Sequence, residues 1–299
     1  MATQRPPPEC YHRHMNRTLA VAVLALALGA AACARNAGAP EAPPTDIPAA
    51  PPSTSTAAPA TRPPLATATA TPIVDVGIAI VVGGDLRVRS GPSTQTGVVK
   101  TIKDHTRVTI DSATDGENWL VGTQTWPSTI PDWTRTWFKL SDGTYVYAAF
   151  VFIQQPGEAS PLTDPAGQEK WVDVNVTTQR ATAMIGSTPI YSAGVSTGAP
   201  PFISPLGTHA IEPDGRLPVE RMTATQAGYT AGQASYDVER VLFTQYYDRG
   251  GNALHLNYWR PKEVFGQTAT SHGCVGMQLH DAQYFWLFGF PGMRVEIHP

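Results

Sequence analysis

Charged residues and cysteines are both scarce in this sequence. Charged side chains make up 15% of the 299 residues and the formal net charge is -3. The sequence therefore offers no basic surface for nucleic acid, and we expect no nucleic-acid partner. The three cysteines are odd in number and far apart: Cys10, Cys33 and Cys274. Their spacing fits neither a disulfide framework nor a zinc site, although a single Cys10–Cys33 disulfide is an alternative that the sequence allows.

Glycine and proline are abundant, with 26 and 28 residues, and hydrophobic residues reach 42%. This hydrophobic fraction is enough for packed cores, while the turn-forming residues favour β-rich domains over a helical bundle. The length allows one large domain or two modest domains with tails. We therefore predict a mainly β protein.

Residues 1–33 have the pattern of an export signal. An apolar run at 19–32 follows Arg13 and Arg17, and it is shorter than the roughly 18 residues that span a bilayer. The run ends in small residues before Cys33 and resembles a bacterial lipobox, with Ala30 where leucine is usual. The resemblance implies export and a lipid on Cys33 that anchors the protein in a membrane. The alternative is a plain cleaved signal with an incidental cysteine.

Residues 34–72 consist mainly of Ala, Pro, Thr and Ser, with almost no large apolar side chain. Such a segment cannot bury enough surface to offset its chain entropy. We expect a disordered tether, which in polyproline II form would reach on the order of 100 Å.

Residues 73–155 predict a small antiparallel barrel. Alternating strands are indicated at 86–89, 98–102 and 137–147, and the last of these contains an Asp-Gly hairpin signal. The letters LRVRSGPS at 86–93 and WFKL at 137–140 resemble the bacterial Src homology 3-like family, whose domains often accompany cell-wall enzymes. The tryptophans of an inserted loop either stack on a ligand or pack on the barrel: Trp119, Trp126 and Trp133.

Residues 168–298 read as a mostly β domain with one short helix after Cys274. The helical pattern begins with Asp281 as N-cap and stops at Gly289. A long insertion at 213–232 is a candidate lid.

Cys274 lies within the letters TSHGCVG at 270–276. A thiol is a strong nucleophile only as thiolate, and its reference pKa of about 8.5 leaves little thiolate at neutral pH. A histidine base is therefore expected nearby. His272 is too close along the backbone, whereas His255 belongs to another predicted strand and can approach the sulfur from the side. A backbone carbonyl near Leu256 would orient the other ring nitrogen of His255.

The rest of the predicted site surrounds the thiol. Backbone N–H groups of Gly273 and Cys274 would stabilise an oxyanion. We expect His272 to shape the loop or contact substrate. The predicted substrate-binding residues are Ser271, Tyr246 and Tyr229.

A histidine, a spacer of about fifteen residues and SHGC resemble the L,D-transpeptidase family, named for its YkuD domain. Here these features are His255 and residues 271–274, and the similarity covers roughly 168–298. Two positions depart from the family pattern: Leu256 stands where glycine often follows the histidine, and Gly276 stands where Arg or Asn is usual. Specificity is expected to differ accordingly.

The resemblance implies an acyltransferase that needs no metal or other cofactor. Cys274 would take a peptidoglycan tetrapeptide stem as a thioester, release D-Ala, and pass the stem to the amine of a second one, forming a 3→3 cross-link. This reaction serves cell-wall biogenesis and cell shape, at the outer face of the cytoplasmic membrane or in the cell wall or periplasm. Two alternatives stay open: an L,D-carboxypeptidase or hydrolase with the same nucleophile, and a non-catalytic wall-binding scaffold.

Mass spectrometry of the mature N-terminus tests the predicted lipid anchor. We expect the chain to begin at Cys33 and to carry the added mass of lipid. A mature N-terminus without lipid would favour the plain cleaved signal.

Overall fold

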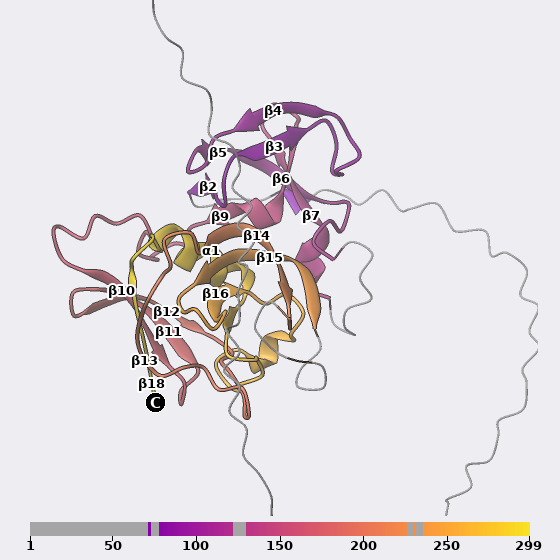
Figure 1. Cartoon of the computed structure of the whole chain (residues 1–299). Helices are drawn as coiled ribbons and strands as arrows, with labels where there is room; N and C mark the ends of the chain where they lie inside the picture. Colours follow the sequence, from indigo (N-terminus) through magenta and orange to yellow (C-terminus); the bar gives the residue numbers. More distant parts are fainter. Residues whose placement is uncertain (1–70, 73–77, 122–129, 226–229, 231–235) are drawn as a thin grey trace, which may run out of the picture. The chain divides into compact units, whose positions relative to one another are not determined.

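The computed structural model describes residues 71–72, 78–121, 130–225, 230 and 236–299. The predicted signal and nearly all of the tether, including Cys33, lie outside the described residues, as do Trp126 and Tyr229. The described residues belong to one compact unit and are mainly β, as predicted (Figure 1). None of the described helices is long and apolar enough to cross a membrane.

The N-terminal part of this unit is built from short strands. In chain order its elements are β1 Thr71–Pro72, β2 Ala79–Val81, β3 Leu86–Arg89, β4 Val98–Ile102, β5 Arg107–Val108, β6 Ile110–Asp115, η1 Asp132–Arg135, β7 Thr136–Leu140, β8 Tyr145–Tyr147, η2 Ala148–Phe150 and β9 Val151–Ile153. They pair into a six-stranded sheet, β1-β6-β7-β8-β3-β4, and a three-stranded sheet, β5-β2-β9. All of these pairings are antiparallel.

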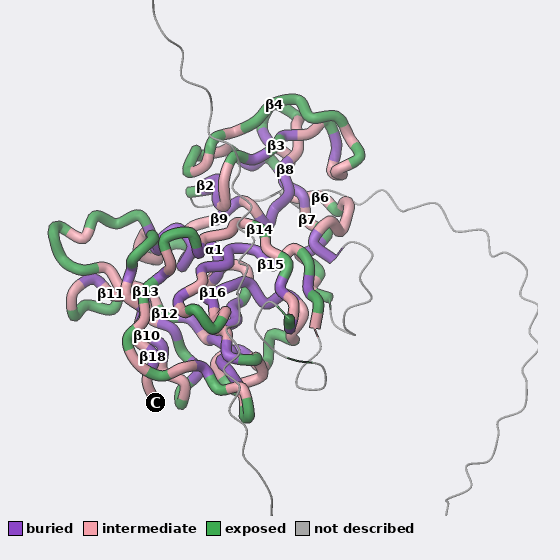
Figure 2. The backbone as a smooth tube through the Cα atoms, viewed as in Figure 1, coloured by how far each residue is buried: buried purple, intermediate pink, exposed green. Residues whose placement is uncertain are grey.

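The two sheets share a small apolar core but do not close into one ring of strands within residues 78–153. In β3, Leu86 and Val88 are buried while Arg87 is exposed, so the alternation in the sequence marks this strand accurately. Strand β4, at the sheet edge, is exposed along most of its length (Figure 2). Its exposed residues include Val98 and Val99. The predicted barrel is therefore present as two sheets.

The C-terminal part begins after a connector and contains the predicted helix. Its elements are β10 Lys170–Asn175, β11 Arg180–Ile185, β12 Thr188–Gly194, β13 Gly207–Ala210, β14 Arg216–Thr223, β15 Asp237–Tyr246, β16 Ala253–Leu256, η3 Lys262–Val264, β17 Val275–Met277, α1 Leu279–Phe288 and β18 Arg294–His298. A five-stranded sheet has the order β12-β11-β10-β18-β13, and a four-stranded sheet has the order β14-β15-β16-β17.

Helix α1 starts earlier than the sequence predicts. Its N-cap is Gln278, and Asp281 lies inside the first turn, where its carboxylate accepts a hydrogen bond from the Tyr191 hydroxyl. The helix is buried along most of its length, as is β16 (Figure 2). The helix is apolar on most of its sides. The sequence therefore lacks a clear alternation of apolar and polar faces that would show where the helix starts.

Much of the insertion at 213–232, the predicted lid, is a strand of the sheet. Its first half forms β14, which pairs antiparallel along β15. The hydrophobic pattern of the sequence does not indicate this strand, because the strand is only half-buried. Met222 is buried, whereas Val219 is 44% exposed. The residues at 226–229 lie outside the described part of the chain.

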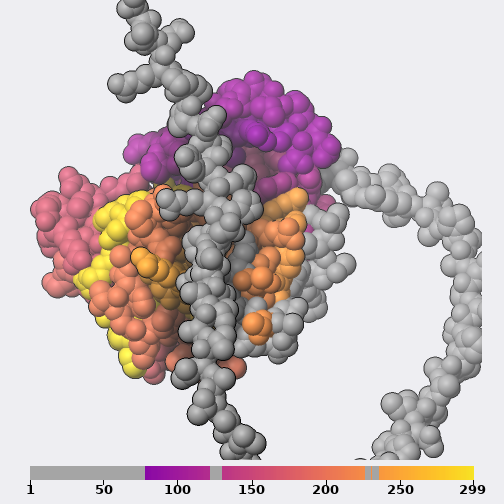
Figure 3. Space-filling model, in the orientation of Figure 1, coloured from indigo at the N-terminus to yellow at the C-terminus, as the bar shows by residue number. Residues whose placement is uncertain are grey.

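Helix α1 also joins the two parts of the unit. The Gln283 side chain is 3% exposed and donates hydrogen bonds to the backbone carbonyls of Ala149 (2.8 Å) and Val151 (3.2 Å). The His280 ring stacks on Phe152, with ring centroids 5.0 Å apart. In the space-filling view, purple atoms of the N-terminal part border orange and yellow atoms of the later elements (Figure 3).

Replacing Gln283 tests this junction. Gln283→Ala leaves two buried carbonyls without their donor, and each unsatisfied group costs about 1–3 kcal/mol. We expect the midpoint of urea unfolding to fall clearly, while the exposed control Gln267→Ala leaves it unchanged. Equal midpoints for the two variants would show that Gln283 does not hold the two parts together.

Candidate active site

Parallel pairing of β16 with β17 brings the predicted nucleophile and base together. His255 lies in β16 and is in register with Gly276 of β17, so Cys274, just before β17, lies beside it. Parallel neighbours need a crossover connection, and residues 257–274 supply it. His255 and Cys274 are nineteen positions apart in the sequence and thus become neighbours in space.

His255 is held in one orientation by its own strand. The side chain is 3% exposed, and Nδ1 is 2.8 Å from the carbonyl oxygen of Leu256. Since a carbonyl only accepts, Nδ1 carries the proton and Nε2 is left with its lone pair. The ring also stacks on Trp259, with centroids 5.7 Å apart. Burial lowers the pKa of His255 to about 4, so the ring is neutral at pH 7.

The Cys274 thiol is also neutral at rest. Burial raises its pKa to about 11, against an opposing backbone hydrogen bond from Ala253. The Sγ atom donates to the Gly251 carbonyl oxygen at 3.8 Å. Within the described residues no hydrogen bond joins Sγ to His255. The dyad is therefore thiol and imidazole, and the thiol must turn from Gly251 toward Nε2 to react.

Ser271 organises the loop that presents the thiol. Its hydroxyl donates to the carbonyl oxygen of Cys274 at 2.5 Å and accepts from the N–H of Gly273 at 3.2 Å. Gly273 has φ +115°, and a Cβ added there would lie 2.0 Å from Oδ1 of Asn252. Only glycine fits this backbone.

Two cavities meet at Cys274. The first, of about 130 Å³, brings together four of the predicted residues: His255, Ser271, His272 and Cys274. The second, of about 340 Å³, contains Cys274 and the predicted Tyr246. Sequence reasoning missed Tyr236 and Met222, which line both cavities. Met222 lies within the long insertion at 213–232 and Tyr236 just after it, and neither belongs to a motif.

The two cavities differ in charge. The first has Arg260 and His272 and no carboxylate in its lining. The second is lined by three carboxylates and one guanidinium: Glu212, Glu220, Asp248 and Arg249. One thiol is thus approached from a cationic side and from an acidic side. Among the described residues, no group of three or more His, Cys, Asp or Glu side chains could hold a metal ion.

The departure at Gly276 has a structural counterpart. A Cβ at Gly276 would lie 2.7 Å from Nδ2 and 2.9 Å from Cβ of Asn257. Asn257 is 4% exposed and lines the cationic cavity. The amide of Asn257 therefore occupies the space that a side chain at position 276 would need.

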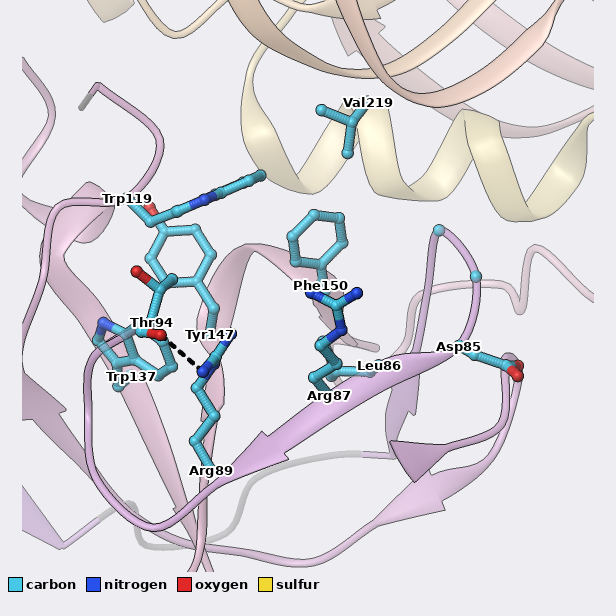
Figure 4. A pocket seen from close by; sticks show the side chains of 12 residues that line it. Asp85, Leu86, Arg87, Arg89, Thr94, Trp119, Trp137, Tyr147, Phe150 and Val219 are labelled. Atoms are coloured by element: carbon cyan, nitrogen blue, oxygen red, sulfur yellow. Dashed lines mark hydrogen bonds between the residues drawn. The ribbon is translucent and has the colours of Figure 1, made fainter. Parts of the chain in front are cut away.

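A further cavity, of about 290 Å³, lies between the N-terminal strands and β14 (Figure 4). Trp119 lines it and packs against Tyr147 and Phe150, with ring centroids 5.7 and 5.8 Å apart. The Arg240 guanidinium lies 4.9 Å from the Trp119 ring centroid. Trp119 is thus packed down onto the strands, although one face still borders the cavity.

Comparison with known proteins identifies the C-terminal part. Residues 169–297 match the YkuD family, described as the L,D-transpeptidase catalytic domain. No curated protein matches the chain.

Solved structures with similarity to the chain include three L,D-transpeptidases. One from Mycobacterium smegmatis is 17% identical with a TM-score of 0.41, over 55% of this chain and 66% of that one. L,D-transpeptidase 3 from Mycobacterium tuberculosis, in complex with a faropenem-derived adduct, is 13% identical with a TM-score of 0.40, over 78% and 98%. The catalytic domain from E. faecium is 16% identical with a TM-score of 0.38, over 44% and 98%.

The neutral dyad predicts how alkylation of Cys274 depends on pH. With a thiol pKa of about 11, the thiolate fraction and the rate with iodoacetamide should rise about tenfold per pH unit from pH 6 to 9. A preformed thiolate–imidazolium pair would instead give a rate nearly independent of pH. Mass spectrometry of the alkylated protein measures the rate, and a plateau below pH 8 would contradict the neutral dyad.

Proposed function

Since residues 169–297 belong to the YkuD family of L,D-transpeptidase catalytic domains, we propose that the protein cross-links peptidoglycan stem peptides through a thioester on Cys274. The observation that carries the proposal is the meeting of two oppositely charged cavities at one thiol beside a neutral, oriented histidine. Transfer from one peptide to another needs a binding site for each peptide beside the same nucleophile.

Acylation follows from the neutral dyad. Sγ of Cys274 attacks the carbonyl carbon that precedes the terminal D-Ala of a tetrapeptide, and the thiol proton passes to Nε2 of His255. The Cys274 N–H stabilises the oxyanion. Collapse of the intermediate breaks the amide bond, and His255 returns the proton to the departing amine of D-Ala. The hydrogen bond from Nδ1 to Leu256 keeps the ring in place through both transfers.

Deacylation uses the same groups in reverse. The side-chain amine of a second stem attacks the thioester carbon, His255 takes the amine proton, and the sulfur leaves and is reprotonated. The carboxylates of the donor peptide suit the cavity with Arg260, whereas the amine of the acceptor suits the cavity with Glu212, Glu220 and Asp248. The product is a 3→3 cross-link.

Hydrolysis by the same nucleophile is the second candidate. In that reaction water replaces the acceptor amine and the product is a tripeptide. The acidic cavity favours transfer, because it can concentrate an amine beside the thioester while water needs no such site.

We also propose a location and a role for the N-terminal segments. A lipid on Cys33 and the tether at 34–72 would place the enzyme outside the cytoplasmic membrane, within reach of the wall. The strands at 78–153, which resemble the bacterial Src homology 3-like family, would position the catalytic part there. Contacts such as Gln283 with Ala149 support such a positioning role.

Incubation with purified tetrapeptide stems, followed by mass spectrometry, tests the proposed function. We expect a dimer with the mass of two tetrapeptides less one D-Ala, because one D-Ala leaves for each bond formed. Cys274→Ala should abolish the product, since the acyl group then has no nucleophile to bind. His255→Gln should lower the rate at least a hundredfold, in line with the loss of a general base.

The control is His105→Gln, which changes an exposed histidine of the N-terminal strands and should leave the rate unchanged. A tripeptide as sole product would favour hydrolysis. An unchanged tetrapeptide would reject both enzymatic functions.

A further inference from the structure

The peptide bond between Gly273 and Cys274 is held at one end by two buried hydroxyl groups. The carbonyl oxygen of Gly273 accepts hydrogen bonds from Oγ of Ser204 at 2.7 Å and from the hydroxyl of Tyr247 at 3.2 Å. Both donors are 2% exposed. They come from segments distant in sequence, Ser204 from the loop before β13 and Tyr247 from the end of β15.

Both hydroxyls donate to this carbonyl, and the two side chains also lie within hydrogen-bonding reach of each other. Oγ of Ser204 accepts from the N–H of Gly198 at 2.9 Å, so its single proton is left for Gly273. Burial raises the pKa of Tyr247 well above its ordinary value, which keeps that hydroxyl protonated and able to donate. Gly198 packs so closely that an added Cβ would lie 2.8 Å from Cα of Gly273. The carbonyl is therefore fixed in direction.

The other end of the same peptide group is open. Within the described residues, the N–H of Cys274 makes no hydrogen bond, whereas the N–H of Gly273 is engaged by Ser271. In a trans peptide the carbonyl and the N–H point in opposite directions. Fixing the carbonyl of Gly273 therefore also fixes where the N–H of Cys274 points.

We propose that Ser204 and Tyr247 are positioning residues that aim and polarise the N–H of Cys274 as the oxyanion donor of the acylation step. Hydrogen bonds to a carbonyl draw electron density away from the peptide nitrogen, so the N–H at the far end becomes a stronger donor. A donor that is already oriented needs no rearrangement when the oxyanion forms. The two hydroxyls act through the backbone, since neither Ser204 nor Tyr247 belongs to the lining of the two cavities at the thiol.

This inference rests on the proposed role of Cys274 as an acylated nucleophile, and it does not depend on the identity of the peptide. The test therefore compares two reactions of the full-length protein. Iodoacetamide alkylates the thiol without forming an oxyanion, so its rate reports the thiol alone. p-Nitrophenyl acetate acylates the thiol through a tetrahedral oxyanion, so its rate reports the donor as well.

Tyr247→Phe and Ser204→Ala each remove one hydroxyl from the Gly273 carbonyl. We expect each to lower the acylation rate about tenfold, less than the loss when an oxyanion donor itself is removed, with alkylation changed by less than about twofold. In a titration with ester concentration, the fall should appear in the limiting rate and not in the half-saturation concentration. The matched control is Tyr284→Phe in α1, because the buried hydroxyl of Tyr284 has no hydrogen-bond partner among the residues that the structure describes.

Three outcomes would overturn the inference. Equal falls in acylation and alkylation would show that the hydroxyls only stabilise the loop. Unchanged acylation in Tyr247→Phe, which keeps the buried ring, would decide against it even if Ser204→Ala fails to fold. A wild-type protein that is alkylated but never acylated would reject both this inference and the proposed thioester. Acylation by the ester without reaction of stem peptides would reject only the proposed substrate.

Discussion

The parallel pairing of β16 with β17 is the constraint on which the candidate site depends. It fixes His255 opposite Gly276 and delivers Cys274 to the same edge of the four-stranded sheet. Burial of both strands then determines the chemistry, because the low-dielectric surroundings disfavour both the imidazolium and the thiolate. In the proposed reaction these two groups act as a neutral acid–base pair and form charge only as the reaction proceeds. Fixed backbone dipoles then have to stabilise that charge, and we propose the Gly273–Cys274 peptide group for this role.

Sequence reasoning predicted the candidate nucleophile and base that the structure brings together, because their chemistry limits their identity. A single thiol in the C-terminal part and a histidine on another predicted strand left few choices, and even the carbonyl of Leu256 as orienting group was predicted and is found. Strands with clear alternation, such as β3, were also located from the pattern alone.

What the sequence did not reveal depends on long-range contacts. Strand β14 is half-exposed and lies in a segment that reads as an insertion, so its pairing with β15 leaves no periodic signal. Asp281 has the residue type of an N-cap, but its carboxylate is engaged by Tyr191, and α1 begins earlier. The hydroxyls of Ser204 and Tyr247 are far apart in the sequence and converge on one backbone oxygen only in the fold, so no local pattern indicates that they meet.

Asn257 and Gly276 fill one volume between them, and this has a consequence for sequence divergence. A larger side chain at 276 would collide with the amide of Asn257, so position 276 cannot gain a side chain while Asn257 keeps its place. Among descendants of this chain, a residue with a Cβ at 276 should arise together with a smaller residue at 257. Position 257 borders the same cavity as the thiol, so each such paired exchange would also reshape the surface that we propose for the substrate. Substrate preference and packing at this point are therefore expected to change together.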